Sequence, residues 1–461
     1  MIETVAILGD TLCGWIAAAA LARRLPRAEY RVLVIDTGAR GDGLGDFAPL
    51  IAVPPALAAF HADLGLDDRQ LVDGTGGGYA LGTVLAGWRA DGATAFLSYG
   101  ETGAPLDGVA FRHLAARLRS AGQTVRFADH AIAALAAQSG RFDPAAPIDR
   151  ALHLDSSLYA RMLRSIACNN GAENASAPLR DITTDGPIAT HLTLTDGTTV
   201  EPFLLLDCTG TAPTDAPFED WSHWLPCNRT ATETVPADGA PPPFAQVDAQ
   251  DAGWVMGWPL DGADVRVACS VDGAGRSFRQ GALAAPWTGN RIALGAASCL
   301  LEPLHPTALP LLLNALVRLI QYWPADRTDP VASAAFNRGT TGEQARARDF
   351  VIAQYAAAGR PGAFWNARRT TELPDTVVAK RDLFAARGRL PMFDDEPFEE
   401  EDWAAMFDAM GVVPRRHDAL ADLLPIPAIE RHLAAHRAAM IDRVRSLPPY
   451  AQVVARRRAV A

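Results

Sequence analysis

A strand–turn–helix–strand pattern at the amino terminus is the feature that most constrains the fold of this chain. Thr4 to Leu8 is a continuous apolar run, which is typical of a buried parallel strand. A turn from Gly9 to Gly14 follows, and an alanine-rich helix is expected from Trp15 to about Leu25. A second apolar run ends at Asp36, 22 residues after Gly14. The pattern predicts a βαβ unit in which an acid after the second strand meets a ribose hydroxyl.

The turn departs from the G-x-G-x-x-G pattern at one position. Gly9 and Gly14 are present, but Thr11 replaces the middle glycine. That glycine normally lets a pyrophosphate approach the backbone, while the helix amino terminus favours its charge. A β-branched side chain at position 11 leaves less space for a pyrophosphate to approach the backbone. Two interpretations therefore stay open, a working dinucleotide site or an inherited fold with an impaired phosphate site.

The patterns further along the chain predict its organisation. An amphipathic helix is expected from Asp155 to Asn170 with Asp155 as its N-cap, and strands are expected from 189 to 200 and from 203 to 207. Residues 291–320 repeat the strand–turn–helix pattern, and the chain becomes helical and more charged beyond about 335. We expect a core with an interleaved substrate-binding layer over 1–330 and a helical region over 331–461.

Charge and cysteine usage limit the class of protein. The net charge of −11 argues against a nucleic-acid groove or an anionic membrane surface as partner. The six cysteines form no CxxC pair, so neither a metal site nor a disulfide framework is expected. The apolar stretch from Leu309 to Ile320 is interrupted and too short to span a bilayer. These features favour a soluble cytoplasmic protein, in which Arg456 to Arg458 form a solvated tail.

Six motifs share one resemblance. They are Gly14-Trp15-Ile16-Ala17-Ala18, Gly43-Leu44-Gly45-Asp46-Phe47-Ala48, the stretch Gly78 to Trp88, Leu206-Asp207-Cys208-Thr209-Gly210, Gly253-Trp254-Val255-Met256-Gly257-Trp258-Pro259-Leu260, and Leu300 to Ala308. In this order along the chain they resemble signatures of the flavin-dependent tryptophan halogenases. Asp349 to Tyr355, Trp403 and Gly411 to Pro414 extend the resemblance over the helical region.

The resemblance implies a fold and a set of binding residues. The fold is α/β, an FAD-binding Rossmann-like core of the GR2-type monooxygenases and halogenases with a substrate β-layer and a helical carboxy-terminal region. An apolar barrier between flavin and substrate is implied at Trp254, Trp258 and Pro259. Cofactor contacts are implied at Gly9, Thr11, Gly14, Trp15, Asp36, Gly45, Asp46, Ala48, Thr307 and Ala308.

Two substitutions affect the chemistry that the family performs. Ala80 stands where the family carries its catalytic lysine, and a methyl group can neither donate a hydrogen bond nor carry an electrophilic halogen. His305 stands where a glutamate holds the substrate near that lysine. An imidazole there is the one catalytic candidate, since it can accept or donate a proton near neutral pH. The alternative is a loop histidine that makes a structural hydrogen bond.

Three functions remain open. The first is an FAD-dependent oxidoreductase that uses reduced FAD from a separate flavin reductase and O2 on a small aromatic or planar substrate, with His305 as acid or base. The second is halogenation of such a substrate with bound halide and a different relay residue. The third is a non-catalytic relative that acts as a binding or regulatory protein. The oligomeric state is left open, with a homodimer as one candidate.

Overall fold

The computed structural model describes residues 2–38, 40–214 and 216–459, and the chain divides into two compact units. Unit 1 comprises Met1–Thr75, Leu154–His223 and Phe278–Arg346. Unit 2 comprises Gly76–His153, Trp224–Ser277 and Ala347–Ala461. Each unit is interleaved in sequence. The predicted boundary near residue 330 stays a prediction, because these units are defined by internal contacts and not by independent folding.

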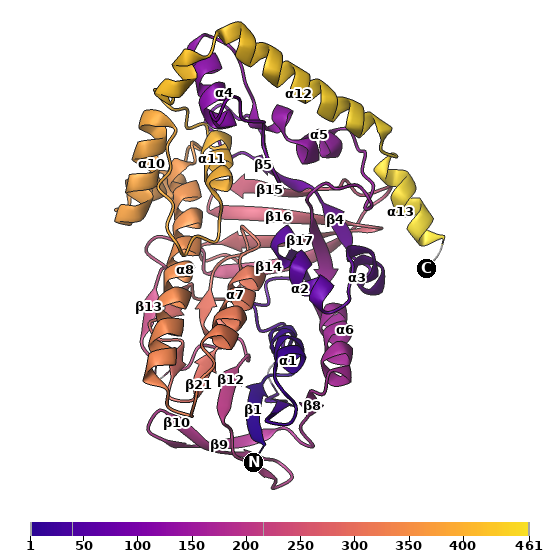
Figure 1. Ribbon diagram of the computed structural model, residues 1–461, viewed down its shortest axis with the longest axis vertical. Coiled ribbons are helices and arrows are strands. Elements are labelled where there is room, and N and C mark those ends of the chain that lie inside the picture. The colour runs from indigo at the N-terminus through magenta and orange to yellow at the C-terminus, as the bar shows by residue number, and fades with distance from the viewer. Residues whose placement is uncertain (1, 39, 215, 460–461) are drawn as a thin grey trace. The chain divides into compact units, whose positions relative to one another are not determined.

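A mainly parallel sheet forms the core of unit 1. Its strands follow the order β20-β21-β12-β1-β2-β8, so β1 lies between β12 and β2. Figure 1 labels β21, β12, β1 and β8 of this sheet. The bounds are β1 (Glu3–Leu8), β2 (Tyr30–Ile35), β8 (Glu173–Asn174), β12 (Leu204–Asp207), β20 (Trp287–Thr288) and β21 (Arg291–Ala293). Val5 pairs with Val32 on one side and Leu204 on the other. The predicted strands and the α/β fold class are confirmed.

Helices of unit 1 begin where side chains cap them. The helix α1 (Leu12–Arg24) starts three residues before the predicted Trp15, because the Thr11 side chain accepts a hydrogen bond from the Gly14 amide and caps the helix. Asp155 caps α6 (Ser156–Asn169) as predicted. Pro310 lies in the first turn of α7 (Ala308–Gln321), where its missing N–H is not needed. The other helices wholly in unit 1 are α2 (Ala58–Asp63) and α3 (Asp68–Thr75).

Two small antiparallel sheets also lie within unit 1. One orders β11 (Thr199–Val200), β10 (Ile188–Leu194) and β9 (Leu179–Asp185), and its inner residues pack against the parallel sheet. The other orders β13 (Phe218–Asp220), β19 (Gly281–Leu283) and β22 (Cys299–Leu300). The second sheet brings residue 280 beside the loop that follows β22.

A seven-stranded sheet organises unit 2, in the order β18-β14-β17-β16-β15-β5-β6 (Figure 1). The bounds are β5 (Gly82–Ala86), β6 (Ala95–Ser98), β14 (Arg229–Pro236), β15 (Ala245–Gln250), β16 (Gly253–Leu260), β17 (Ala263–Ser270) and β18 (Arg276–Ser277). β5 and β15 are parallel, and the other neighbours are antiparallel. Next to this sheet in sequence, β4 (Gly78–Ala80) pairs with β7 (Ala151–Asp155).

Helices dominate the carboxy-terminal region, as predicted. They are α8 (Pro330–Ala357), α9 (Ala363–Thr370), α10 (Asp375–Arg387), α11 (Glu400–Ala409), α12 (Ile426–Ser446) and α13 (Tyr450–Arg458), and unit 2 also holds α4 (Phe111–Ser120) and α5 (Ile132–Gln138). Arg456 and Arg458 are exposed, as predicted for a solvated basic end, although the segment is helical and not a free tail. Residues 456–458 end the helix α13, where Arg458 pairs with Asp261 and Arg457 donates to the carbonyl of Gly77.

None of the helices in the described part of the chain combines the length and the apolar composition that a bilayer crossing requires. Among residues 2–38, 40–214 and 216–459, no three side chains with histidine, cysteine or carboxylate groups are arranged to hold a metal ion.

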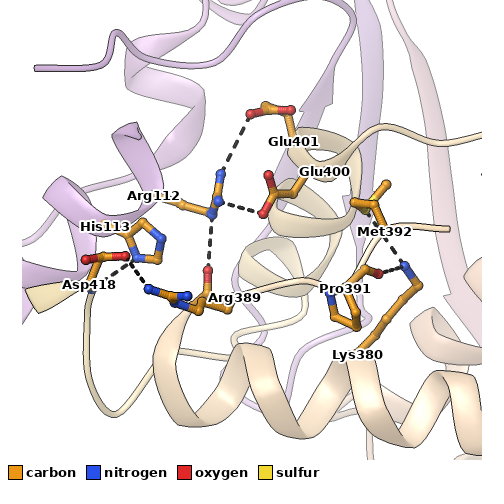
Figure 2. A network of polar contacts seen from close by, with 10 residues as sticks. Arg112, His113, Lys380, Arg389, Pro391, Met392, Glu400, Glu401 and Asp418 are labelled. Atoms are coloured by element: carbon orange, nitrogen blue, oxygen red, sulfur yellow. Dashed lines mark hydrogen bonds and ion pairs between the residues drawn. The ribbon is translucent and has the colours of Figure 1, made fainter. Parts of the chain in front are cut away.

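A fully buried lysine fastens the segment between α10 and α11. The Lys380 ammonium lies 2.7 Å from a carboxylate oxygen of Glu396, and the lysine side chain is 0% exposed. The rings of Trp403 and Phe393 lie 4.6 and 5.1 Å from the ammonium nitrogen. The ammonium also donates to the carbonyl of Pro391, as Figure 2 shows. Attraction to the carboxylate and to the ring faces therefore offsets the loss of water around this charge.

A second ionic group in Figure 2 connects α4 to the same segment. Arg112 lies 2.6 Å from Glu400 and donates to the carbonyl of Gly388. Asp418 pairs with Arg389 at 2.8 Å, and its backbone amide donates to His113. Burial lowers the pKa of His113 to about 4, so this imidazole is neutral at pH 7.

The substitution Lys380→Met tests the buried pair. It leaves the Glu396 carboxylate buried without its cation, so the free energy of unfolding falls by about 3–5 kcal/mol. Urea denaturation measures the change. The double variant Lys380→Met/Glu396→Gln removes both charges and loses less. A loss below about 1 kcal/mol in the single variant, the value of an exposed ion pair, contradicts the role assigned to Lys380.

Candidate functional site

The turn after β1 is built on glycines that approach the backbone closely. Gly9 has a φ of +110°, and a β-carbon there would lie 2.9 Å from the carbonyl oxygen of Cys208. A β-carbon at Gly14 would lie 2.1 Å from the carbonyl oxygen of Gly9. Both positions therefore require glycine. The turn is held against the end of β12, at the carboxyl edge of the parallel sheet, where ligands of open α/β folds bind.

Thr11 uses its hydroxyl within the fold. Its Oγ1 donates to the carbonyl of Cys208 at 3.0 Å and accepts from the Gly14 amide at 3.1 Å. The Cys13 amide donates to the carbonyl of Asp42 at 2.9 Å. Two of the first amides of α1 are therefore satisfied by the chain itself. The helix dipole still favours an anion at this end, but fewer direct donors remain for a phosphate than a glycine at position 11 would leave.

Trp15 is buried behind the turn and holds an acid in place. Its indole N–H donates to Asp10 at 2.6 Å, and the Arg164 guanidinium lies 3.6 Å from the same carboxylate. The Arg164 guanidinium also lies over the indole ring, 5.2 Å from its centroid. This arrangement gives Trp15 a packing role, whereas the resemblance implies a cofactor contact at this position. The Asp10 carboxylate belongs to the turn, where its charge opposes that of a phosphate.

Asp36 ends β2 as predicted and is exposed at the carboxyl edge of the sheet. One of its oxygens accepts from the Gly38 amide at 2.7 Å, which fixes the direction of the carboxylate. A carboxylate at this edge fits the hydroxyl groups of a ribose. Asp36 therefore fits the ribose end of a dinucleotide. The turn and the amino terminus of α1 fit the pyrophosphate only in part, because two of their amides are already bonded within the chain.

Two acids lock the loop from Gly41 to Asp46. An oxygen of Asp42 accepts from the amides of Leu44 at 2.7 Å and Asp46 at 3.0 Å, and an oxygen of Asp46 accepts from the amide of Asp42. Asp46 has a φ of +53°, which an aspartate adopts more readily than most residues. Burial and the neighbouring Asp46 charge raise the pKa of Asp42 to about 7. Sequence reasoning missed Asp42, which no motif includes.

The loop from 41 to 46 joins the turn to the start of α7. The Ala296 amide donates to the carbonyl of Gly43 at 3.0 Å. Leu44 and Ala308 line one cavity of about 20 Å³. Gly45 lies in this loop and Ala48 follows it in sequence, and Phe47 packs edge-on against Phe278 at 5.0 Å. Unit 1 thus brings together the predicted residues of the turn, this loop and the first turn of α7.

His305 lies in the loop between β22 and α7 and is half-buried. Its carbonyl accepts from the Thr307 amide at 2.8 Å. The buried pair Gln280 and Glu302 holds the start of this loop through two hydrogen bonds of 2.9 Å. His305 is not among the residues that line the 20 Å³ cavity. Sequence reasoning missed the pair, because Gln280 lies in no motif and is 22 residues from Glu302 in the sequence.

In unit 2, Ala80 is the last residue of β4 and is 0% exposed. It pairs with Ala151 of β7, and the next amide, of Leu81, donates to the carbonyl of Pro243 at 2.7 Å. The position at which the resemblance places a lysine therefore holds a buried methyl group in a hydrogen-bonded strand.

The aromatic motif of unit 2 forms β16. Trp254 and Trp258 are four residues apart in one strand, so both side chains point to the same face, and both are buried. Pro259 pairs in register with Asp264 of β17. The Trp258 ring lies 5.5 Å from that of His153, whose pKa is lowered by burial to about 4. The sequence analysis did not predict a neutral imidazole beside this tryptophan. The feature that could have indicated it is a histidine within the apolar run of β7.

Comparisons with known proteins agree with this arrangement. The family model described as tryptophan halogenase matches residues 4–271 and 263–425. BrvH, a flavin-dependent halogenase from Brevundimonas sp. BAL3, is 29% identical with a TM-score of 0.91, over 99% of each chain. Xcc4156, a flavin-dependent halogenase from Xanthomonas campestris, is 30% identical with a TM-score of 0.90, over 99% of this chain and 98% of the other. The tryptophan 6-halogenase ThaL of Streptomyces albogriseolus is 26% identical, over 93% of this chain and 91% of its own.

The raised pKa of Asp42 predicts a pH dependence of stability. The folded chain binds a proton at Asp42 that the unfolded chain releases near pH 3.8. The stabilisation is therefore complete below about pH 4 and is lost as the pH rises through about 7. The free energy of unfolding is expected to fall between about pH 4 and about pH 7.

The variant Asp42→Asn keeps an acceptor for the Leu44 and Asp46 amides but cannot ionise, so it flattens this fall. Asp36→Asn is the matched control, since it removes an exposed acid from the same edge and keeps Asp42. An unchanged slope in Asp42→Asn shows that this carboxyl does not titrate as described.

Proposed function

Because this chain belongs to the tryptophan halogenase family, we propose that it is an FAD-dependent oxidoreductase whose reaction with substrate does not pass through the family lysine. Flavin dependence is the property of the family. The substrate is proposed to be a small aromatic or planar molecule, and the donor of reduced FAD a separate flavin reductase. The observation that carries the proposal is Ala80, a buried methyl group at the position of the lysine.

Residues at the carboxyl edge of the parallel sheet are proposed to hold the dinucleotide. Asp36 faces the ribose, and the turn from Gly9 to Gly14 with the α1 amino terminus faces the pyrophosphate. The remaining contacts are assigned to Trp15, Gly45, Asp46, Ala48, Thr307 and Ala308. Reduced FAD, when bound, supplies the electrons for the reaction with O2. Trp254, Trp258 and Pro259 provide an apolar wall that excludes water.

His305 is proposed to hold or move the proton of the reaction. It is half-buried in a loop whose start is held by the Gln280–Glu302 pair, so its position is restricted. An imidazole there can act as acid or base near neutral pH. It cannot replace the negative charge of the glutamate that the family uses to hold its substrate. Halogenation therefore needs a relay residue other than position 80 and another way of holding the substrate.

A non-catalytic binding protein is the second candidate function. Thr11 and Asp42 already satisfy the Gly14 and Cys13 amides, which removes donors from the phosphate site. A chain without the family lysine cannot use flavin for halogenation by the family route, so it has less need to hold the flavin tightly. This candidate predicts weak or absent flavin binding.

Flavin titration of the purified protein separates the two candidates. We expect micromolar dissociation constants for oxidised FAD and for reduced FAD under nitrogen, measured by fluorescence quenching and calorimetry. The variant Thr11→Gly frees the Gly14 amide and is expected to bind FAD several-fold more tightly. Asp36→Asn is expected to bind more weakly, because the ribose loses a charged acceptor. No binding of either flavin form favours the non-catalytic candidate.

Turnover then tests the chemistry. The protein, a flavin reductase, NADH and O2 are incubated with a panel of indoles and phenols, with and without bromide. A product heavier by one oxygen atom supports the proposal, and a brominated product supports halogenation by another relay.

Restoring the lysine tests whether one residue explains the divergence. Ala80→Lys is expected to give no brominated product, because position 80 is buried in β4 and His305 replaces the glutamate. The double variant Ala80→Lys/His305→Glu restores both groups and is the matched comparison. Mass spectrometry detects the product, and circular dichroism checks the fold of each variant. A brominated product from Ala80→Lys alone, absent from the wild type, shows that the remaining chemistry is intact.

A further inference from the structure

A small cavity lies beneath the first turn of α7 in unit 1. Leu44, Leu311 and Leu312 contribute apolar walls, and Ser298 and Gln344 contribute polar groups. Gln344 comes from the middle of α8, so the cavity lies between two helices and the turn that follows β21. None of these polar groups belongs to a motif, and the proposed function does not use them.

The hydrogen bonds of Gln344 are incomplete. Its amide nitrogen donates to the Ser298 hydroxyl oxygen at 2.8 Å, whereas its amide oxygen has no partner. Gln344 is 3% exposed, and the oxygen is out of reach of bulk solvent. Because buried acceptors are rarely left unpaired, this oxygen indicates a donor that enters the cavity. The Ser298 hydroxyl accepts through its oxygen, which leaves its hydrogen for a second bond.

The volume of the cavity decides what can enter. It measures about 20 Å³, and a buried water needs roughly 10–15 Å³ by the same kind of measure. A ring system does not fit, since ligand pockets start at roughly 300 Å³. An anion is excluded because the unpaired group is an acceptor. A metal ion is excluded because no carboxylate lines the cavity. One neutral molecule with hydrogen-bond donors, of the size of water, meets all these conditions.

We propose that this cavity is a binding site for one ordered water molecule, which donates to the Gln344 amide oxygen and accepts from the Ser298 hydroxyl. The water joins α8 to the turn from 295 to 298. The Ser298 amide donates to the Gly295 carbonyl, and the Ala296 amide donates to the Gly43 carbonyl. Gln344 is thereby a positioning residue for the loop from 41 to 46. The proposal does not depend on the proposed function, because it concerns the protein without flavin.

A high-resolution crystal structure of the full chain tests the site. We expect a density peak about 2.7–3.2 Å from the Gln344 amide oxygen and from the Ser298 hydroxyl. The variant Gln344→Met keeps the length of the side chain and removes the acceptor, so the peak is expected to disappear. Gln344→Glu keeps an acceptor and retains it. An empty cavity in the wild type, or a peak that persists unchanged in Gln344→Met, overturns the proposal.

A solution measurement supports the test where a variant does not crystallise. Water in long-lived contact with the protein gives cross-peaks to nearby amide protons in NMR. We expect such a cross-peak at the Ser298 or Cys299 amide in the wild type and its loss in Gln344→Met. Its absence in the wild type overturns the proposal. Flavin affinity is measured separately. If the proposed function fails, the protein binds no flavin although the water is present, so the two failures are distinguishable.

Discussion

The close approach of backbone segments at the carboxyl edge of the parallel sheet is the constraint on which the rest of the structure depends. A β-carbon at Gly43 would lie 2.6 Å from the Cys208 carbonyl and 2.9 Å from the Thr11 hydroxyl. One at Gly295 would lie 2.5 Å from the Gly43 carbonyl. Segments far apart in sequence therefore meet in backbone contact at the ends of β1, β12 and β21. This contact fixes the edge at which we propose that the flavin binds.

The contact explains why the scaffold of the family is retained while its chemical groups differ. Glycines at backbone contacts have no substitute, because any side chain collides with a carbonyl group. Ala80 is constrained in a different way, because it is 0% exposed and a longer side chain there needs space in the core. His305 is half-buried in a loop, where a side chain can change without moving the backbone. This chain, at 29% identity to BrvH, therefore shares its fold at a TM-score of 0.91.

Sequence patterns predicted the elements well and the polar contacts poorly. The strands β1, β2 and β12 and the cap at Asp155 follow from local periodicity and capping chemistry, and the family resemblance is confirmed by the match over residues 4–271 and 263–425. The hydrogen bond from Thr11 to Cys208 joins residues 197 apart, which no local pattern reveals. The same limit applies to the Lys380–Glu396 pair and to Gln344. The roles proposed for Trp254 and His305 stay predictions, because they concern bound molecules.

A crystal structure of the full chain grown with excess FAD tests the proposed flavin site. We expect the dinucleotide at the carboxyl edge of β1 and β2, with its ribose on Asp36 and its pyrophosphate beside the turn from Gly9 to Gly14. Crystals that form with FAD in excess and show no dinucleotide at this edge, or show it bound elsewhere, rule this site out.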